Sequence, residues 1–236
     1  TEDHDVFNRY INDGRQFLKN KAVDSAIQSF EQAFSIRGNT PELTFILAKL
    51  FQIVNKPDMS DTYYKYTLAL KPDHFEYLYD YMMHLVDTSR YKDAIEVLQR
   101  CIRLHPENAQ LYNDMGVLYN SLDNYSKAIE YFYSAFTVNP DYLVPMINLG
   151  HLHVQTGELL KADEILALCL KKEPQSSEVK ELAEVIAAAK TSAGSGNEVL
   201  RKELSFSDQS FQIVPMQILE KFGQSISFEN IALSIV

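Results

Sequence analysis

A proline recurs every 34 residues along this 236-residue chain, at Pro72, Pro106, Pro140 and Pro174. A fixed period of this length constrains the fold more strongly than composition does, because stacked repeats require it and compact globular domains do not. The sequence therefore predicts an array of repeated structural units.

Columns of small and aromatic residues keep the same 34-residue register as the prolines. The columns are Ala26, Ser60, Ala94, Ala128 and Ala162; Phe30, Tyr64, Leu98, Phe132 and Leu166; Ala33, Thr67, Cys101, Ala135 and Cys169; and Gly14, Ala48, Met82, Gly116 and Gly150. They divide the chain into five predicted repeats, at 7–40, 41–74, 75–108, 109–142 and 143–176.

Each repeat carries the pattern of two amphipathic helices joined by a short turn. In the fourth repeat Leu111, Met115 and Tyr119 recur at helical spacing, the pattern stops near Asp123, and it resumes at Ala128. The small residues allow the paired helices to approach closely, and the aromatic residue fills the space beside them. The proline after the second helix cannot continue that helix and so ends the unit.

The fourth repeat resembles the tetratricopeptide repeat family at Tyr112, Met115, Gly116, Tyr119, Tyr125, Ala128, Phe132, Ala135 and Pro140. The other repeats keep the same phase without insertion. The resemblance implies an all-α fold, a right-handed superhelical solenoid of about five helical hairpins. The second repeat departs most from the family pattern, at Thr44, Pro57 and Ser60, and we expect lower local stability there.

The residues after the fifth repeat form three predicted segments. Residues 177–190 place apolar side chains on one stripe and predict the capping helix that a repeat array needs at its end. Residues 191–197 are small and polar, as in a flexible linker, and fit either an engineered fusion joint or a natural linker. Residues 198–236 lack the repeat register and are rich in large apolar residues, so they must bury those residues against another surface.

Charge and composition argue against several classes of function. The chain has 32 acidic and 22 basic residues, a net charge of -10, which disfavours a nucleic-acid partner. Its apolar runs are shorter than the roughly 18 residues that a membrane-spanning helix needs. Its two cysteines, Cys101 and Cys169, lie two repeats apart, so we expect buried free thiols rather than a disulfide. Free thiols indicate a reducing, cytoplasmic compartment.

No motif supports catalysis, a metal site or a cofactor. His151 and His153 lie two residues apart and so point to different sides of a helix, and no acidic residue or thiol at suitable spacing completes a ligand set. His153 continues the 34-residue column of Phe17, Phe51, Leu85 and Tyr119, which predicts a core or half-buried histidine. The sequence also lacks a glycine-rich phosphate loop and a serine nucleophile elbow. We therefore expect a protein that is not an enzyme.

In the family, the first helix of each repeat lines a concave groove, and the resemblance implies a peptide-binding groove here. The candidate lining residues are Asn12, Arg15, Phe45, Lys49, Tyr79, Met83, Asn113, Val117, Asn120, Ile147, Asn148, His151 and Val154. These residues mix apolar and amide side chains, which suits an apolar peptide held by a few amide hydrogen bonds. Only Arg15 and Lys49 are basic, so the basic clamp with which some family members hold acidic C-termini of chaperones is not expected.

The apolar tail is the predicted ligand of this groove, in the same molecule or on a neighbouring protomer. Its expected anchors are Phe206, Phe211, Ile213, Val214, Met216, Ile218, Leu219 and Phe222. Residues 214–223, with 225–226 and 230–233, are similar to the segment that precedes the catalytic domain in some bacterial class III nucleotide cyclases. That resemblance implies a bacterial signalling protein as partner and no cyclase activity, because the catalytic domain and its metal-binding aspartates are absent.

The leading hypothesis is a protein–protein interaction scaffold or adaptor that binds an apolar peptide segment. Two alternatives remain open. One is a secretion-type chaperone that holds an amphipathic client in the same groove. The other is a regulatory repeat domain cut from a larger signalling enzyme, in which case the tail begins a catalytic region.

Overall fold

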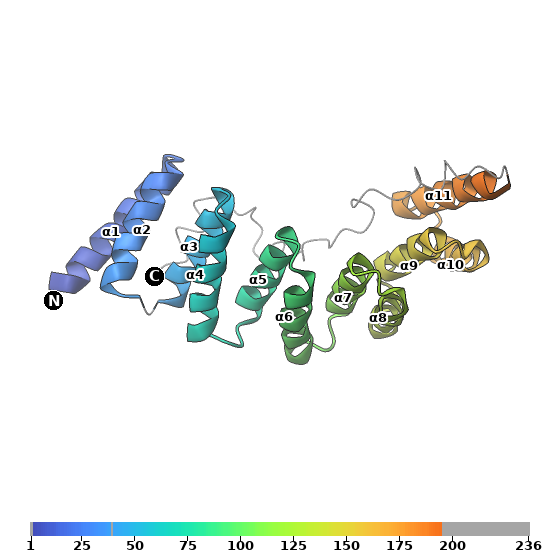
Figure 1. Ribbon diagram of the computed structural model, residues 1–236, viewed down its shortest axis with the longest axis horizontal. Helices are drawn as coiled ribbons and strands as arrows, with labels where there is room; N and C mark the ends of the chain where they lie inside the picture. The colour runs from blue at the N-terminus through green and yellow to red at the C-terminus, as the bar shows by residue number, and fades with distance from the viewer. Residues whose placement is uncertain (1, 39, 195–236) are drawn as a thin grey trace. The chain divides into compact units, whose positions relative to one another are not determined.

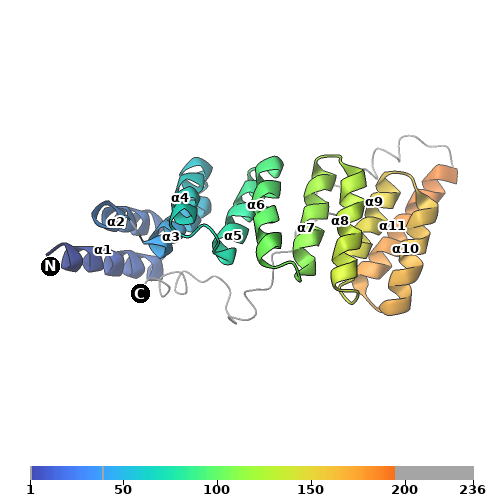
Figure 2. The ribbon, with the colours of Figure 1, turned by 90° about the horizontal axis from the view of Figure 1, so that it is seen from below.

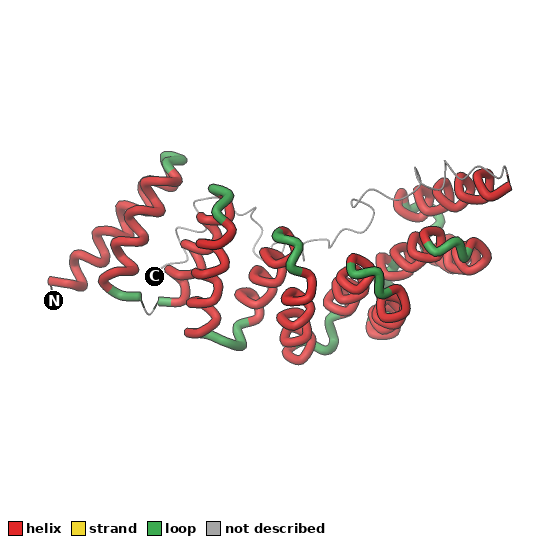
Figure 3. Tube along the Cα trace, in the orientation of Figure 1, coloured by secondary structure: helices red, strands yellow, loops and turns green. Residues whose placement is uncertain are grey.

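The computed structural model of the protein describes residues 2–38 and 40–194, and these residues form eleven α-helices and no strand (Figures 1 and 3). They belong to two compact units, which we describe separately, one ending at Leu104 and the other beginning at His105. The predicted tail at 198–236 lies outside the described residues.

Unit 1 contains three helical hairpins. Its helices are α1 (Glu2–Lys19), α2 (Val23–Ile36), α3 (Pro41–Ile53), α4 (Pro57–Leu70), α5 (Phe75–Asp87) and α6 (Tyr91–Leu104). Each hairpin corresponds to one of the first three predicted repeats, although α1 begins five residues before the predicted start at residue 7. Pro41 and Pro57 stand at the first turn of α3 and α4, where a missing backbone N–H costs no helical hydrogen bond.

Unit 2 contains two hairpins and a final helix, which lie alongside one another in Figure 2. Its helices are α7 (Ala109–Ser121), α8 (Tyr125–Val138), α9 (Val144–Gln155), α10 (Leu159–Lys172) and α11 (Ser177–Gly194). The hairpins coincide with the fourth and fifth predicted repeats. The prediction of an all-α array of helical hairpins followed by a capping helix is therefore confirmed.

The turn inside every hairpin uses the same backbone conformation. One residue in each turn has a positive φ angle, and these residues are Lys21, Asn55, Ser89, Asp123 and Gly157, which recur every 34 residues. Only the last is a glycine, the residue that adopts this left-handed conformation without steric cost. The period visible in the side-chain columns is thus also a period of the backbone.

Small residues in the columns permit close contact between the paired helices. A Cβ atom on Gly14 would lie 2.6 Å from the ring of Phe30, and one on Gly116 would lie 2.6 Å from the ring of Phe132. Cys101 and Cys169 are buried and form no disulfide in the described residues, as the sequence predicts. Burial raises the pKa of the Cys169 thiol to about 11, which keeps it protonated and unreactive.

Polar contacts support the second hairpin, where the sequence departs from the family pattern. Ser60 is fully buried on α4 and donates a hydrogen bond to the carbonyl of Ala48 on α3 at 2.9 Å. Thr67 donates to Thr44 at 2.8 Å across the same pair of helices. Because these buried hydroxyls have partners, they carry little of the usual penalty for burying a polar group.

The capping helix is longer than the sequence predicts. Residues 191–194, assigned to a flexible linker, continue α11 to Gly194. The alanines at 187–189 favour helix, and the hydroxyls of Thr191 and Ser192 donate to the carbonyls of Ala187 and Ala188, one helical turn earlier. Local helix propensity therefore outweighs the linker-like composition over these four residues.

Candidate peptide-binding faces

The first helices of neighbouring hairpins in unit 1 are joined by a row of side-chain contacts. The ring of Phe45 on α3 lies 4.7 Å from that of Tyr77 on α5, measured between centroids. Further along the same helices, Lys49 binds Asp80 at 2.7 Å, and Gln52 donates to Asp87 at 2.9 Å. We call the surface built by α3 and α5 the unit 1 face.

The Lys49–Asp80 ion pair changes the chemistry of this face. Lys49 is one of two basic residues among the predicted lining residues, and Asp80 neutralises its charge within the face. The other, Arg15, lies half-buried on α1, where Asn12 is exposed. A ligand carboxylate would therefore have to compete with Asp80 for Lys49, which disfavours acidic peptide ends.

Apolar side chains run along α5 on the unit 1 face. Phe75, Tyr79 and Met83 follow one another at intervals of four residues, and Val86 extends the stripe by another turn. Tyr79 is buried, and the other three are half-buried. Burial raises the pKa of the neighbouring Tyr77 to about 12, with Glu42 and Glu76 adding to the effect, so its phenol remains neutral. This stripe along α5 therefore presents neutral aromatic and aliphatic side chains.

The corresponding surface of unit 2, built by α7 and α9, is dominated by amides. Asn148 on α9 donates its side-chain N–H to Oδ1 of Asn113 on α7 at 2.9 Å. Asn113 is fully buried, and Asn120, two turns further along α7, is 7% exposed. Nδ2 of Asn113 and Oδ1 of Asn120 have no hydrogen-bond partner within the described part of the chain. We call this surface the unit 2 face.

The apolar residues predicted to line the groove in unit 2 pack into its hydrophobic core. Val117 belongs to a cluster with Phe132, Met146 and Leu149, and Ile147 packs against that cluster. Val154 lies in a second cluster, formed by Ala162, Leu182 and Ile186. These three side chains therefore hold α7 and α9 against their neighbours, and the amides carry most of the polar chemistry of the unit 2 face.

Two histidines on α9 are buried. His151 is 6% exposed, and burial lowers its pKa, an effect that Glu181 partly opposes. His153 is 3% exposed and its Nδ1 lies 2.8 Å from the carboxylate of Glu158, which confirms the prediction of a core histidine. Among the described residues, no group of three or more His, Cys, Asp or Glu side chains is arranged to hold a metal ion.

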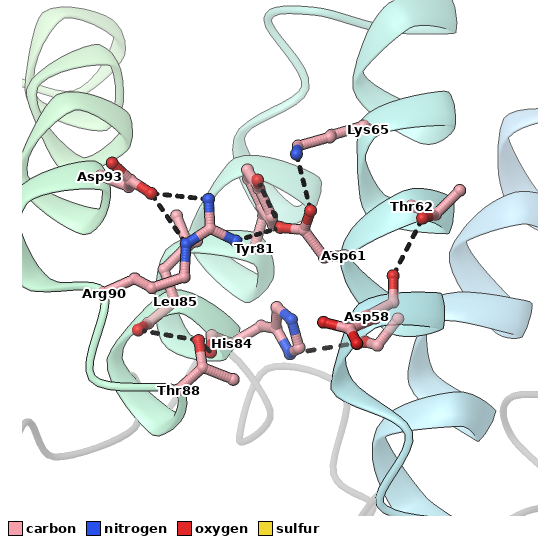
Figure 4. A network of polar contacts seen from close by, with 11 residues as sticks. Asp58, Asp61, Thr62, Lys65, Tyr81, His84, Leu85, Thr88, Arg90 and Asp93 are labelled. Atoms are coloured by element: carbon pink, nitrogen blue, oxygen red, sulfur yellow. Dashed lines mark hydrogen bonds and ion pairs between the residues drawn. The ribbon is translucent and has the colours of Figure 1, made fainter.

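A polar network joins the second and third hairpins of unit 1 (Figure 4). No pattern in the sequence predicts it. The carboxylate of Asp61 on α4 binds Arg90 at 2.6 Å and Lys65 at 2.7 Å. It also accepts a hydrogen bond from the hydroxyl of Tyr81 on α5 at 2.9 Å. Arg90 additionally binds Asp93 of α6 at 2.6 Å, so one carboxylate and one guanidinium tie three helices together.

Comparison with known proteins shows a family match for one repeat and a shared fold for the chain. The family model described as tetratricopeptide repeat matches residues 109–142, the fourth repeat. MamA from Desulfovibrio magneticus superposes with a TM-score of 0.61 at 21% identity, over 73% of this chain and 98% of that one. A tetratricopeptide repeat protein from Parabacteroides merdae gives a TM-score of 0.67 at 14% identity, over 97% and 99% of the two chains. The fourth repeat therefore matches the tetratricopeptide repeat family, and the chain shares the fold of these helical-repeat structures.

A curated relative matches over a longer stretch than the family model. The BBSome complex member BBS4 of Mus musculus is 25% identical over 149 residues, which is 63% of this chain and 28% of that protein. The chain thus spans little more than a quarter of the length of this relative. In the part of the chain that the structure describes, no helix is both long and apolar enough to cross a membrane.

Proposed function

We propose that this protein is a non-catalytic adaptor that binds an apolar peptide segment on the first-helix surfaces of its repeats. The observation that carries the proposal is the chemistry of the unit 1 face. There α5 presents an apolar stripe from Phe75 to Val86, while Asp80 neutralises Lys49. An amphipathic or extended segment with large apolar anchors complements such a surface, and an acidic one does not.

The first occupant we propose is the chain's own tail, around Phe211 to Phe222. This segment carries closely spaced large apolar residues that are unfavourable in water. A tether would raise the local concentration of the segment to roughly millimolar, so a modest intrinsic affinity would keep the unit 1 face filled. Membership of BBS4 in a multi-protein complex is in keeping with an adaptor role.

A fluorescence experiment tests this proposal in the full chain. The protein contains no tryptophan, so Phe211→Trp introduces a single reporter. We expect the emission of this reporter to be blue-shifted and only weakly quenched by acrylamide, because docking removes the indole from water. Adding Tyr79→Ala or Met83→Ala on α5 should expose the reporter. Tyr133→Ala, at an exposed position on the second-helix side of unit 2, is the matched control and should leave the reporter protected.

The outcomes separate the proposed function from its alternatives. A reporter as accessible as free tryptophan in the parent chain would overturn docking of the tail. A reporter that stays protected in the Tyr79→Ala and Met83→Ala variants would show that the tail docks elsewhere than on the unit 1 face. Displacement of the reporter by several unrelated amphipathic clients would favour the secretion-type chaperone instead.

A further inference from the structure

We infer that the unit 1 face selects a partner segment in which lysine or arginine residues stand next to apolar anchors. The inference rests on the proposed peptide-binding function and adds the charge of the ligand at the same face. It predicts that a basic apolar segment of another protein binds this face more tightly than the chain's own tail segment does.

The geometry begins with the order of residues along α5. Three carboxylates, Glu76, Asp80 and Asp87, each directly follow a residue of the apolar stripe. Because successive helix residues are turned by about 100°, these carboxylates form a row beside the stripe, which we call the acidic row. Asp80 binds Lys49 of α3 at 2.7 Å. Asp87 accepts a hydrogen bond from Gln52 of α3 at 2.9 Å, so the acidic row lies on the side of the stripe that faces α3.

The acidic row carries more charge than its neighbours neutralise. Lys49 offsets the charge of Asp80. Glu76 and Asp87 are exposed on the surface, and within the described residues neither forms an ion pair. Burial raises the pKa of Tyr64, and the charges of Asp80 and Asp87 add to this effect, so the row imposes a negative potential on the rings beneath it. A ligand cation would therefore find two carboxylates available beside the stripe.

A lysine or arginine next to an apolar anchor matches this arrangement. When the anchor packs against the stripe, the long aliphatic stem of the basic residue can follow the same surface and place its charge at the acidic row. The chain's own segment 206–222 has large apolar residues, but it carries Asp208 and Glu220 against Lys221. Its net charge is therefore of the same sign as that of the row, and a basic segment of a partner protein complements the face better.

The test uses the full chain with Phe211→Ala and Phe222→Ala in its own tail, so that this tail competes poorly. The first probe is a fluorescein-labelled synthetic peptide of residues 206–222 with its natural sequence. The second probe is the same peptide with Asp208→Lys and Glu220→Lys, which keeps every apolar anchor and reverses two charges. Fluorescence anisotropy measures the Kd of each probe, so the two probes differ only in how their charge suits the acidic row.

We expect the lysine probe to bind the parent about 3- to 10-fold more tightly than the natural probe, the gain that a few surface ion pairs provide. This preference should fall by about 2-fold or more in the Glu76→Gln and Asp87→Asn variants. Glu96→Gln removes the same charge from an exposed position on α6, outside the unit 1 face. It is the matched control and should keep the full preference. Salt of about 1 M should reduce the preference, because it screens exposed charges.

The outcomes separate this inference from the proposed function. Equal affinity of the two probes for the parent would overturn the inference while leaving peptide binding intact. A preference that Glu76→Gln and Asp87→Asn leave unchanged would do the same, since it would reflect the net charge of the chain rather than the acidic row. Failure of both probes to bind would overturn the proposed function and this inference together.

Discussion

The ring of Phe132 on α8 lies 2.6 Å from the point that a Cβ atom would occupy on Gly116 of α7. Both residues are buried, and the contact sets how closely the two helices of the fourth hairpin approach. Gly116→Ala should therefore force the ring or a helix to move. We expect the free energy of unfolding to fall by about 1–3 kcal/mol, the usual cost of overpacking a core, as measured by urea denaturation.

The control for this prediction is Ser121→Ala, at an exposed position on the same helix. It should change stability by less than about 0.5 kcal/mol. Because alanine favours helix over glycine, an increase in stability for Gly116→Ala would show that the helices separate easily and would contradict a rigid contact with Phe132.

Much of this architecture can be predicted from the sequence because one physical constraint is repeated. Small residues facing aromatic residues inside each hairpin must recur wherever two helices pack in the same way, and so the 34-residue columns locate the helices and turns. The predicted capping helix ends at residue 190, four residues before the end of α11 at Gly194. The sequence does not reveal this because Thr191 and Ser192 can donate to helix carbonyls as well as belong to a linker.

Contacts between hairpins are harder to predict. The hydrogen bond between Asn113 and Asn148 joins residues 35 apart, and the Lys49–Asp80 ion pair joins residues 31 apart, so neither follows the 34-residue register. Such contacts depend on the rotation between successive hairpins and on the rotamers of long side chains. The same holds for the packing of Val154, a predicted groove residue, against Ala162 and Leu182 of unit 2.

Gly157 has a φ angle of +78°, and no atom lies within 4 Å of the point where its Cβ would be. Gly157→Ala should therefore destabilise the protein through backbone strain alone, by about 1–2 kcal/mol. The matched change is Ser89→Gly, at the equivalent turn position with a φ angle of 58°, which should leave stability unchanged or raise it. Thermal denaturation of both variants checks this, and equal losses in the two would contradict it.

Asp61 holds the second and third hairpins together through Arg90, Lys65 and Tyr81. Burial opposes ionisation of this carboxyl, but hydrogen bonds from those three side chains lower its pKa. Asp61→Asn keeps the size and removes the charge. We expect a loss of about 1–2 kcal/mol, because the Arg90 and Lys65 side chains are partly exposed and water screens their charges.

Asp93→Asn is the control for Asp61→Asn, since Asp93 also binds Arg90 but is half-exposed. It should cost less than about 1 kcal/mol. Chemical denaturation of both variants in low and high salt measures the difference. An equal loss in the two variants would show that Arg90, rather than the half-buried carboxylate of Asp61, dominates the network.

His84 on α5 should make unit 1 sensitive to acid. Its side chain is 1% exposed, lies 5.3 Å from the ring of Tyr64, and contacts Ser60 at 3.4 Å through Nδ1, while Nε2 has no partner in the described residues. Burial, helped by Arg90, lowers the pKa of this imidazole below 6.5, although Asp61, Asp87 and the carbonyl of Pro57 oppose the shift. The folded protein therefore holds His84 neutral.

The sign of the pH effect follows from the direction of this shift. When the pKa is lower in the folded state, the unfolded chain binds more protons in the window below 6.5, and stability falls as the pH falls toward the folded pKa. Urea unfolding at about pH 7.5 and about pH 5.5 brackets the upper part of that window. Burial also lowers the pKa of His151 in unit 2. The contribution of His84 is therefore the pH dependence that disappears in His84→Leu and remains in His151→Leu. If the stability of His84→Leu falls with acid as steeply as that of the parent, the imidazole between α4 and α5 does not sense pH.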